Sequence, residues 1–388
     1  MIMRFLVNVL KHFIISLIAI TTLASVALVS SGYGYILTGV SRTYMVGNTT
    51  ANIDDHAQFE THTIKAGTPS PWVKHPSYNA KPLQKPLTDY LKKYESAAYL
   101  VIKDGQLLSE HYFSGYDARS KTNSFSMAKS VVTMLLDITI QEGHVDSLNQ
   151  PFTDFFPEFK GDENAKLATI GQLSLMTSGY DWEEAYYSPF SPTVELVYSQ
   201  DIEQFLLTRS FSDKAGERFY YSSASTQLLA IALTRAIRKT HPEMSLADYL
   251  GEKLWKPLGM NDSGLWHTDG QGLELGYCCI STNARNFAKL GQLLLDDGEW
   301  KGQQLLRKDF VEAMRTPQAN DSYGYSLWIN RTNNPSFYQL QGHLGQYITV
   351  VPSENMVVVR LGRQRDKEVS TLTDIIPIYV EHAIALAE

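Results

Sequence analysis

A serine and a lysine three residues apart are the residues of this chain best suited to chemistry. Ser126 and Lys129 lie in the segment Thr122-Asn-Ser-Phe-Ser-Met-Ala-Lys-Ser130, at the start of a strongly helical run. Residues three apart on a helix share a face, so the lysine amine would lie beside the serine hydroxyl. A free serine is a weak nucleophile and needs a base within hydrogen-bond reach. A neutral lysine can be that base if burial or a nearby positive charge lowers its pKa well below the solution value of about 10.4.

The run that follows Lys129 bears on whether the lysine has a task. Taken alone, Ser-x-x-Lys also fits a serine that caps a helix and a lysine that is solvated. The next residues are too apolar for an exposed helix, which Gly143 then ends. A lysine at the head of a buried helix is costly unless it has a partner or a function. The serine would also lie at the helix N-terminus, where backbone N–H groups favour developing negative charge.

Two later segments contain further candidate residues. A turn at Gly216 leads through Glu-Arg-Phe-Tyr to Tyr221-Ser-Ser223, just before a predicted helix. Gln341-Gly-His343-Leu-Gly345-Gln346 lies between two short β-rich runs near the C-terminus. Each segment also has a purely structural interpretation, in which Tyr221 is a core tyrosine and His343 is a structural or surface histidine.

Together the three segments resemble a known family. Ser-x-x-Lys, then Tyr-x-Asn or Tyr-x-Ser, then Lys/His-x-Gly, in this order and at these separations, is similar to the serine β-lactamase and penicillin-binding-protein superfamily. Within it the chain most resembles the class C-like branch that includes 6-aminohexanoate-dimer hydrolases and related serine esterases and peptidases. Leu173-Ser-Leu-Met-Thr-Ser-Gly-Tyr-Asp-Trp182 and the run from Gly276 to Leu295 match further segments of that branch. The resemblance covers about residues 85–387.

The resemblance implies an α+β fold of the β-lactamase/transpeptidase type. An antiparallel sheet flanked by helices would pack beside an all-helical lobe, with the active site between them. The sequence pattern agrees, because strands are expected at both ends of the core and helices in the middle. A hairpin is predicted over 97–113 around Asp104-Gly105. Helices are predicted at 126–142, 199–208, 225–239, 246–255 and 283–296, strands at 323–330, 337–341, 346–351 and 356–362, and a closing helix at about 372–387.

The resemblance also implies catalytic roles. Ser126 would be the acylated nucleophile, and Lys129 would take or relay its proton. Tyr221 would be the partner acid or base, which protonates the leaving group and later helps to activate water. The backbone N–H groups of Ser126 and Gln346 would form the oxyanion hole, where preorganised donors commonly supply a large share of the rate. Whether Lys129 or Tyr221 is the acylation base stays open.

Three residues would face the substrate, and two of them depart from the family pattern. Gly345 would let the strand backbone approach the substrate closely. Ser223 stands where relatives carry asparagine, so a longer amide is replaced by a short hydroxyl. His343 stands where many relatives carry lysine, which removes a fixed cation that holds a substrate carboxylate; it could still polarise Tyr221, although its charge near neutral pH is not set by the sequence. Both departures favour a short amide or ester over a β-lactam.

The leading hypothesis is therefore an exported or membrane-anchored serine hydrolase that cleaves a small amide or ester through an acyl-enzyme. One alternative is a D-Ala-type peptidase or β-lactamase, and another is a non-catalytic binding or sensing module of the same fold.

The chemistry needs no metal and no organic cofactor, and the chain lacks metal-ligand spacings. A net charge of −7 without Lys/Arg runs argues against a nucleic-acid partner. The absence of Gly-x-Ser-x-Gly argues against an α/β-hydrolase. Oligomeric state is not predicted.

The N-terminal segment predicts export. Residues 13–40 contain no charged side chain, and a stretch of this length can span a membrane. Arg4 and Lys11 precede it. We favour an uncleaved anchor, with the catalytic domain periplasmic or otherwise extracytoplasmic. Secretion after cleavage at the small residues 25–27 or 29–31 is the alternative. The expected organisation is an anchor or signal segment at 1–41, a linker or wrapping segment at 42–86, and a hydrolase domain at 87–388.

The two cysteines, Cys278 and Cys279, are adjacent. Ordinary disulfide geometry does not suit sequence neighbours, so we expect two small buried residues. A vicinal disulfide in an oxidising compartment is the less favoured alternative.

Overall fold

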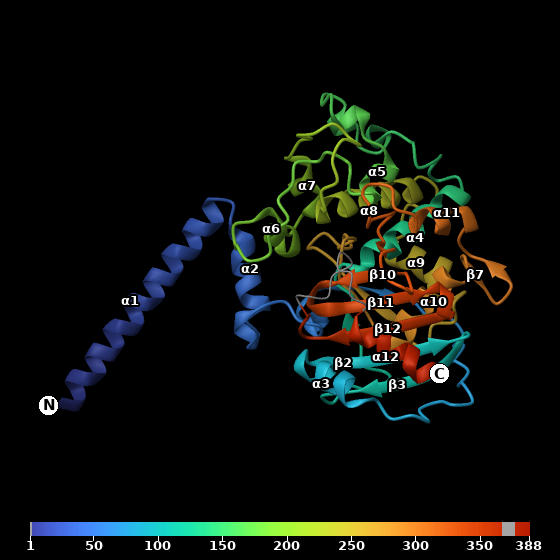
Figure 1. The fold of residues 1–388 in the computed structure, drawn as a ribbon. Coiled ribbons are helices and arrows are strands. Elements are labelled where there is room, and N and C mark those ends of the chain that lie inside the picture. The colour runs from blue at the N-terminus through green and yellow to red at the C-terminus, as the bar shows by residue number, and fades with distance from the viewer. Residues whose placement is uncertain (1, 367–376) are drawn as a thin grey trace. The chain divides into compact units, whose positions relative to one another are not determined.

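The computed structural model describes residues 2–366 and 377–388, and contacts divide the chain into two compact units (Figure 1). One unit comprises Met1–Ala51 and Glu183–Gln200, and the other comprises Asn52–Trp182 and Asp201–Glu388. Every candidate site residue named above belongs to the larger unit.

The smaller unit contains the apolar N-terminal helix. α1 (Ile2–Ser30) has no buried side chain, and among the described residues it is the one helix long and apolar enough to cross a membrane. α2 (Gly34–Arg42) packs against α6 (Pro192–Tyr198) at Gly39, where an added Cβ would lie 3.1 Å from the Tyr198 ring. The segment after α1 is therefore held by residues about 150 positions later in the chain.

A six-stranded antiparallel sheet forms the centre of the larger unit. Its order is β3-β2-β12-β11-β10-β9, so strands from both ends of the chain lie side by side, cyan and red in Figure 1. Asp104 and Gly105 both have positive φ and join the first two strands as the predicted hairpin turn. The strands are β2 (Ser96–Lys103), β3 (Gln106–Tyr112), β9 (Trp328–Asn330), β10 (Phe337–Gly342), β11 (Gln346–Val351) and β12 (Met356–Gly362).

Helices cover both faces of this sheet. Side chains of a strand alternate between faces. Val358 joins the apolar cluster made with α3 (Lys85–Lys93) and α12 (Ile378–Ala387), whereas its neighbour Val357 lies against α10 (Ala284–Leu295). A Cβ on Gly291 of α10 would lie 2.6 Å from Val357, so the absent side chain lets this helix approach the sheet closely.

A helical region and a second sheet complete the larger unit. α4 (Met127–Gln141) and α5 (Ile170–Ser174) both pack on α8 (Ser223–Arg238), and α4 is buried from Met127 to Thr139. The second sheet has the order β1-β5-β6-β4. The remaining elements are α7 (Ile202–Leu207), α9 (Leu246–Leu250), α11 (Lys308–Met314), β1 (Thr61–Ile64), β4 (Thr122–Asn123), β5 (Gly264–His267), β6 (Ile280–Thr282), β7 (Glu299–Trp300) and β8 (Gln303–Gln304).

Three predicted elements differ in extent from the structure. The helix expected at 246–255 is α-helical only over α9 and continues as a π-helix over Gly251–Trp255. The strand expected at 323–330 is limited to β9, because Ser326 has a positive φ and Gly324 N–H bonds back to Leu327 O in a turn. The helix expected at 199–208 begins only at Ile202, where the Asp201 carboxylate caps it by accepting from Gln204 N–H. Of the closing helix expected at about 372–387, residues 372–376 lie outside the described residues, and α12 accounts for the rest.

The segment expected to link or wrap the domain contributes structure beside the nucleophile. β1 pairs with β5. The Ile53 carbonyl accepts from Asn123 N–H at 2.8 Å, and the Asn123 amide donates to the Asp55 carboxylate at 2.8 Å. Residues from Asn52 onward therefore support β4, the short strand that leads to Ser126.

Candidate active site

A sharp turn presents Ser126 at the head of α4. Phe125 has a φ of +45°, a left-handed conformation that non-glycine residues adopt at a cost. Just before it, Ser124 is fastened to β6, since its N–H donates to Ile280 O and its hydroxyl accepts from Ile280 N–H. Ser126 occupies the N-cap position, but its side chain does not cap the helix. The capping interpretation of this serine is therefore wrong.

The hydroxyl and the backbone N–H of Ser126 are not used by the fold, whereas its carbonyl accepts from Lys129 N–H at 3.1 Å. Its side chain is half-buried, and no described residue forms a hydrogen bond with its hydroxyl. Likewise, no described residue accepts a hydrogen bond from its backbone N–H. A hydroxyl without a protein partner can act as a nucleophile, and an N–H without a protein acceptor can bind the oxyanion of a substrate. Both groups of Ser126 therefore fit these roles.

Lys129 is buried, and its Nζ lies among hydrogen-bond partners. The residue is 1% exposed, which excludes the solvated alternative. Its Nζ donates to Ser223 Oγ at 3.0 Å and to the Tyr277 carbonyl at 3.1 Å. It also lies 5.2 Å from the ring centroids of both Tyr221 and Tyr277, within cation–π range. These contacts compensate part of the cost of burying the polar end of a lysine.

The structure therefore brings Lys129, Tyr221 and Ser223 together at the head of α8. Tyr221 is half-buried, and its ring lies 5.5 Å from that of Trp328 and 6.2 Å from that of Tyr323. Ser223 is 2% exposed and accepts from Lys129. The sequence predicted a substrate contact for Ser223, whereas the hydrogen bond seen here orients the lysine.

The turn between β10 and β11 packs against the residues that precede Ser126. The His343 ring lies edge-on to the Phe125 ring, with 5.6 Å between centroids. A Cβ on Gly342 would lie 2.2 Å from the Ser124 carbonyl oxygen, so only glycine fits there. Sequence reasoning did not single out Gly342, although it lies directly before the His-x-Gly motif.

A buried arginine holds this turn in place, and sequence reasoning missed it. Arg360 is fully buried in β12, and its guanidinium donates to the carbonyls of Leu344, Gly345 and Tyr94 and to Ser96 Oγ. Burial lowers the pKa of Arg360 below its ordinary value. The available signal was a single charged residue inside the apolar strand run Met-Val-Val-Val-Arg-Leu.

Gln346 is locked by its side chain. It is fully buried, and its amide nitrogen donates to the carbonyls of His343 and Gly362 while its amide oxygen accepts from Gly362 N–H. The side chain is therefore occupied by the fold, and only the backbone of Gln346 is left for the predicted oxyanion role.

Replacing Gly345 with alanine is expected to destabilise the protein by about 1–3 kcal/mol or more. Gly345 has a φ of +83°, and its Cβ would lie 2.3 Å from Arg360 Nη1. The close approach at Gly345 is thus to a buried guanidinium, whereas the sequence predicted an approach to substrate. Gly302→Ala is the matched control, because Gly302 has the same φ of +83° with nothing within 4 Å of its Cβ. Urea unfolding of both variants tests this, and equal losses would contradict the Arg360 contact.

His343 is neutral at physiological pH in this environment. Burial, with a smaller contribution from Arg365, lowers the pKa of His343 to about 4. The histidine therefore does not replace the fixed cation that a lysine would supply at this position.

This pKa makes stability depend on pH in a defined direction. The unfolded histidine takes up a proton near pH 6.5, while the folded one does so near pH 4. Protonation thus favours the unfolded state, and the stability present above pH 6.5 is lost as the pH falls toward 4. Relative to His343→Gln, the wild type is expected to lose about 2–3 kcal/mol between pH 7.5 and 4.5. Subtracting the stability change of the variant cancels the contribution of other groups. Asp55 is one of them, since burial raises its pKa to about 7 and its effect on stability has the opposite sign. Urea midpoints that shift in parallel would contradict this.

The cysteines form a bond that the sequence did not favour. Cys278 and Cys279 are joined by a disulfide, directly after Tyr277, whose carbonyl contacts Lys129. The expectation of two free buried residues is therefore wrong, although both side chains are buried. In residues 2–366 and 377–388, no group of three or more His, Cys, Asp or Glu side chains is placed to hold a metal ion.

Comparisons with known proteins agree with this geometry. A family model described as Beta-lactamase matches residues 84–376. A 6-aminohexanoate-dimer hydrolase of Paenarthrobacter ureafaciens is 24% identical over 296 residues, which is 70% of this chain and 73% of that protein.

Solved structures share the fold. The "Putative 6-aminohexanoate-dimer hydrolase from Bacillus anthracis" aligns with a TM-score of 0.70 at 21% identity, over 85% of this chain and 90% of that one. A family VIII carboxylesterase aligns with a TM-score of 0.60 at 15% identity, over 81% and 98%. The predicted β-lactamase/transpeptidase-like fold class is confirmed.

Proposed function

The chain belongs to the beta-lactamase family and is a serine hydrolase that acts on amide or ester bonds, and from this premise we propose that it cleaves a short amide or ester through an acyl-enzyme on Ser126. The observation that carries the proposal is the position of Lys129. Its buried Nζ lies on the first turn after Ser126, 3.0 Å from Ser223 Oγ and 5.2 Å from the centroid of the Tyr221 ring. A lysine buried in this way, three residues along the helix from a serine with an unused hydroxyl, fits activation of a nucleophile.

The proposed chemistry has two halves. In the first, Ser126 Oγ attacks the carbonyl carbon, its proton passes to Lys129 as the neutral amine or to Tyr221 as the phenolate, and the leaving amine or alcohol departs with a proton from that pair. In the second, water loses a proton to the same pair and attacks the acyl-enzyme; the bond to Oγ then breaks, the acid leaves, and the pair returns a proton to Ser126 Oγ. The N–H groups of Ser126 and Gln346 would stabilise the oxyanion in both halves. No step requires a metal or an organic cofactor.

Three observations favour a short amide or ester over a β-lactam. His343 is neutral, so it offers no cation to a carboxylate. Ser223 has no side-chain amide to bind a β-lactam side chain, and its hydroxyl already accepts from Lys129. The curated relative is named for the dimer of 6-aminohexanoate, which is an amide and not a β-lactam.

We also propose that α1 anchors the protein in a membrane with the larger unit exported. α1 is 29 residues long and exposes its apolar side chains throughout, as a membrane-spanning helix does. Cleavage as a signal segment would leave a secreted enzyme. Alkaline carbonate extraction of membranes from producing cells separates the two, since an anchored chain stays with the lipid and a cleaved one does not.

Mass spectrometry of the protein after incubation with a mixed library of amides, esters and β-lactams tests the function. The expected result is a transient acyl adduct on Ser126 from a linear amide or ester, with turnover. A stable penicillin adduct on Ser126 would instead support a D-Ala-type peptidase. No adduct and no turnover with any class would support a non-catalytic binding or sensing module.

A further inference from the structure

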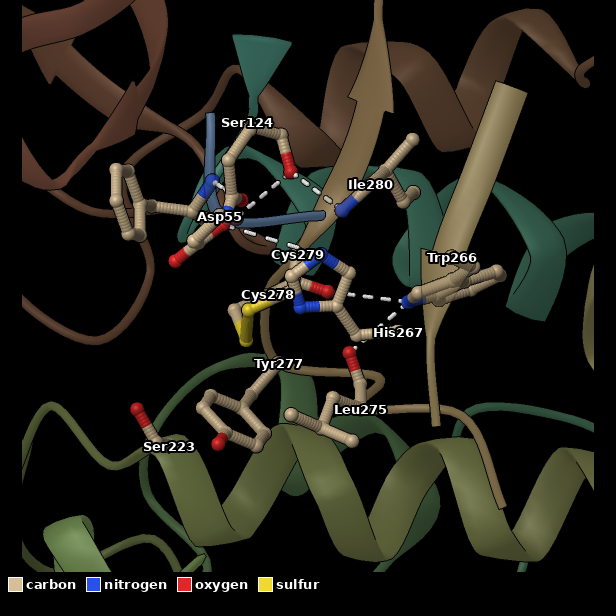
Figure 2. Close-up of a disulfide and its surroundings, with 12 residues drawn as sticks. Asp55, Ser124, Ser223, Trp266, His267, Leu275, Tyr277, Cys278, Cys279 and Ile280 are labelled. Carbon is tan, nitrogen blue, oxygen red and sulfur yellow. Dashed lines mark hydrogen bonds and ion pairs between the residues drawn. A yellow bond between two sulfur atoms is a disulfide. The ribbon is translucent and has the colours of Figure 1, made fainter. Parts of the chain in front are cut away.

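The vicinal disulfide lies next to the proposed proton-transfer group. Cys278 and Cys279 are 3.7 Å apart at Cα, and Cys279 has a φ of +74°. Figure 2 shows the sulfur atoms between the Tyr277 ring and Asp55. The side chains are 5% and 6% exposed. The bond therefore closes a small ring in the backbone directly after the carbonyl that accepts from Lys129.

Hydrogen bonds hold the backbone on both sides of the disulfide. The Tyr277 carbonyl accepts from Lys129 Nζ at 3.1 Å. The Cys278 carbonyl accepts from the Trp266 indole N–H at 3.0 Å, and the Cys279 carbonyl accepts from His267 N–H at 3.2 Å. The Tyr277 oxygen belongs to the peptide group whose N–H, that of Cys278, donates to Leu275 O at 3.0 Å. Where this oxygen points depends on that turn and on the torsion angles of Cys278 and Cys279. Cys279 has a positive φ, a conformation that residues other than glycine rarely adopt.

We propose that the Cys278–Cys279 bond is a redox-modifiable site that positions the Tyr277 carbonyl against Lys129, so that the oxidised chain acylates Ser126 faster than the reduced one. The inference rests on the proposed function of Lys129. Tyr277, Cys278 and Cys279 are positioning residues, because they act on the substrate only through the lysine.

A dithiol would carry out the modification. One thiolate of the dithiol attacks a cysteine sulfur, the protein S–S bond breaks, and a mixed disulfide forms. The second thiolate displaces the protein sulfur from that mixed disulfide. The protein gains two electrons and two protons as a pair of thiols, and the dithiol leaves as a cyclic disulfide. With the ring open, Cys279 is free to move to a negative φ, which turns the adjoining peptides and moves the Tyr277 carbonyl from Lys129.

Two double variants separate backbone positioning from the disulfide itself. Cys278→Ala/Cys279→Gly removes both sulfurs but supplies a residue that accepts positive φ without penalty. Cys278→Ala/Cys279→Val removes both sulfurs and supplies a β-branched residue, for which positive φ is least accessible. The measured quantity is the second-order rate constant for fluorophosphonate labelling of Ser126 in the full-length protein. The wild type is measured before and after dithiothreitol, with two free thiols verified by mass.

Reduction of the wild type is expected to slow labelling by roughly 10- to 100-fold, as misplacement of a catalytic group does. The glycine variant should label at the oxidised wild-type rate and ignore dithiothreitol, and the valine variant should label at the reduced rate. Melting temperatures of all four samples identify unfolding, which a purely structural disulfide would produce without this pattern. A fully reduced wild type that labels at the oxidised rate, or a glycine variant as slow as the valine variant, would overturn the proposal. Failure of the oxidised wild type to label would count against the proposed function instead.

Discussion

Ser126→Ala is expected to abolish both hydrolysis and fluorophosphonate labelling, with kcat falling by roughly 10⁴- to 10⁶-fold. The hydroxyl of Ser126 is the atom that would form the acyl bond, and no neighbouring group can replace it. The fold does not use this hydroxyl, since it neither caps α4 nor bonds to a described residue. The substitution should therefore leave the melting temperature nearly unchanged. Initial rates with the substrate that acylates the wild type measure the loss.

Ser130→Ala is the matched control on the same helix. Ser130 lies one turn further along α4, and its hydroxyl donates to the Ser326 carbonyl at 2.6 Å. Removing this buried hydrogen bond should cost about 1 kcal/mol of stability, while activity and labelling are retained. The reverse outcome, with activity kept in Ser126→Ala, would rule out the acyl-enzyme.

Local pattern was enough to predict most of the elements that support the site. The apolar run after Lys129 predicted α4, and Asp104-Gly105 predicted the first hairpin. These signals are carried by residues close in sequence, so the chain reveals them directly. Element ends were less accurate, because they depend on single contacts such as the Asp201 cap or the turn at Ser326.

The contacts within the site were not accessible from the sequence in the same way. Lys129 meets the Tyr277 carbonyl across 148 positions, and Arg360 reaches Tyr94 across 266. No local pattern encodes such pairs, because any backbone carbonyl can accept. The family resemblance named Ser126, Lys129 and Tyr221, but it did not indicate that Ser223 would accept from the lysine.

Burial explains the remaining differences between expectation and structure. A histidine has no defined charge until its surroundings are known, and the packing of His343 beside Phe125 lowers its pKa to about 4. The cysteine pair was judged from sequence by ordinary geometry alone. The structure places Cys279 at a positive φ in a loop that is held by hydrogen bonds from Trp266 and His267. This conformation depends on contacts across residues 266–280, which the cysteine pair alone does not reveal.

Lys129→Met is expected to lower kcat by roughly 10²- to 10⁴-fold, the usual contribution of a positioned acid or base. KM should change much less, because Lys129 is buried and contacts protein groups. Methionine fills a similar volume without a charge to bury. The acceptors Ser223 Oγ and the Tyr277 carbonyl lose one donor each, which costs about 1–3 kcal/mol apiece. This cost is offset because the buried polar end of the lysine is removed as well, so the melting temperature should move by only a few degrees.

Lys289→Met provides the control, because Lys289 is a second buried lysine in a comparable setting. It is fully buried, donates to the carbonyls of Ser70 and Gly259, and has its pKa lowered by burial to about 8. A lysine that merely satisfies carbonyls should behave like this one, with some change in stability and activity retained. The two variants should therefore have similar stability and differ in kcat by about two orders of magnitude or more. Similar activity in both would identify Lys129 as a structural lysine and would leave Tyr221 as the base for Ser126.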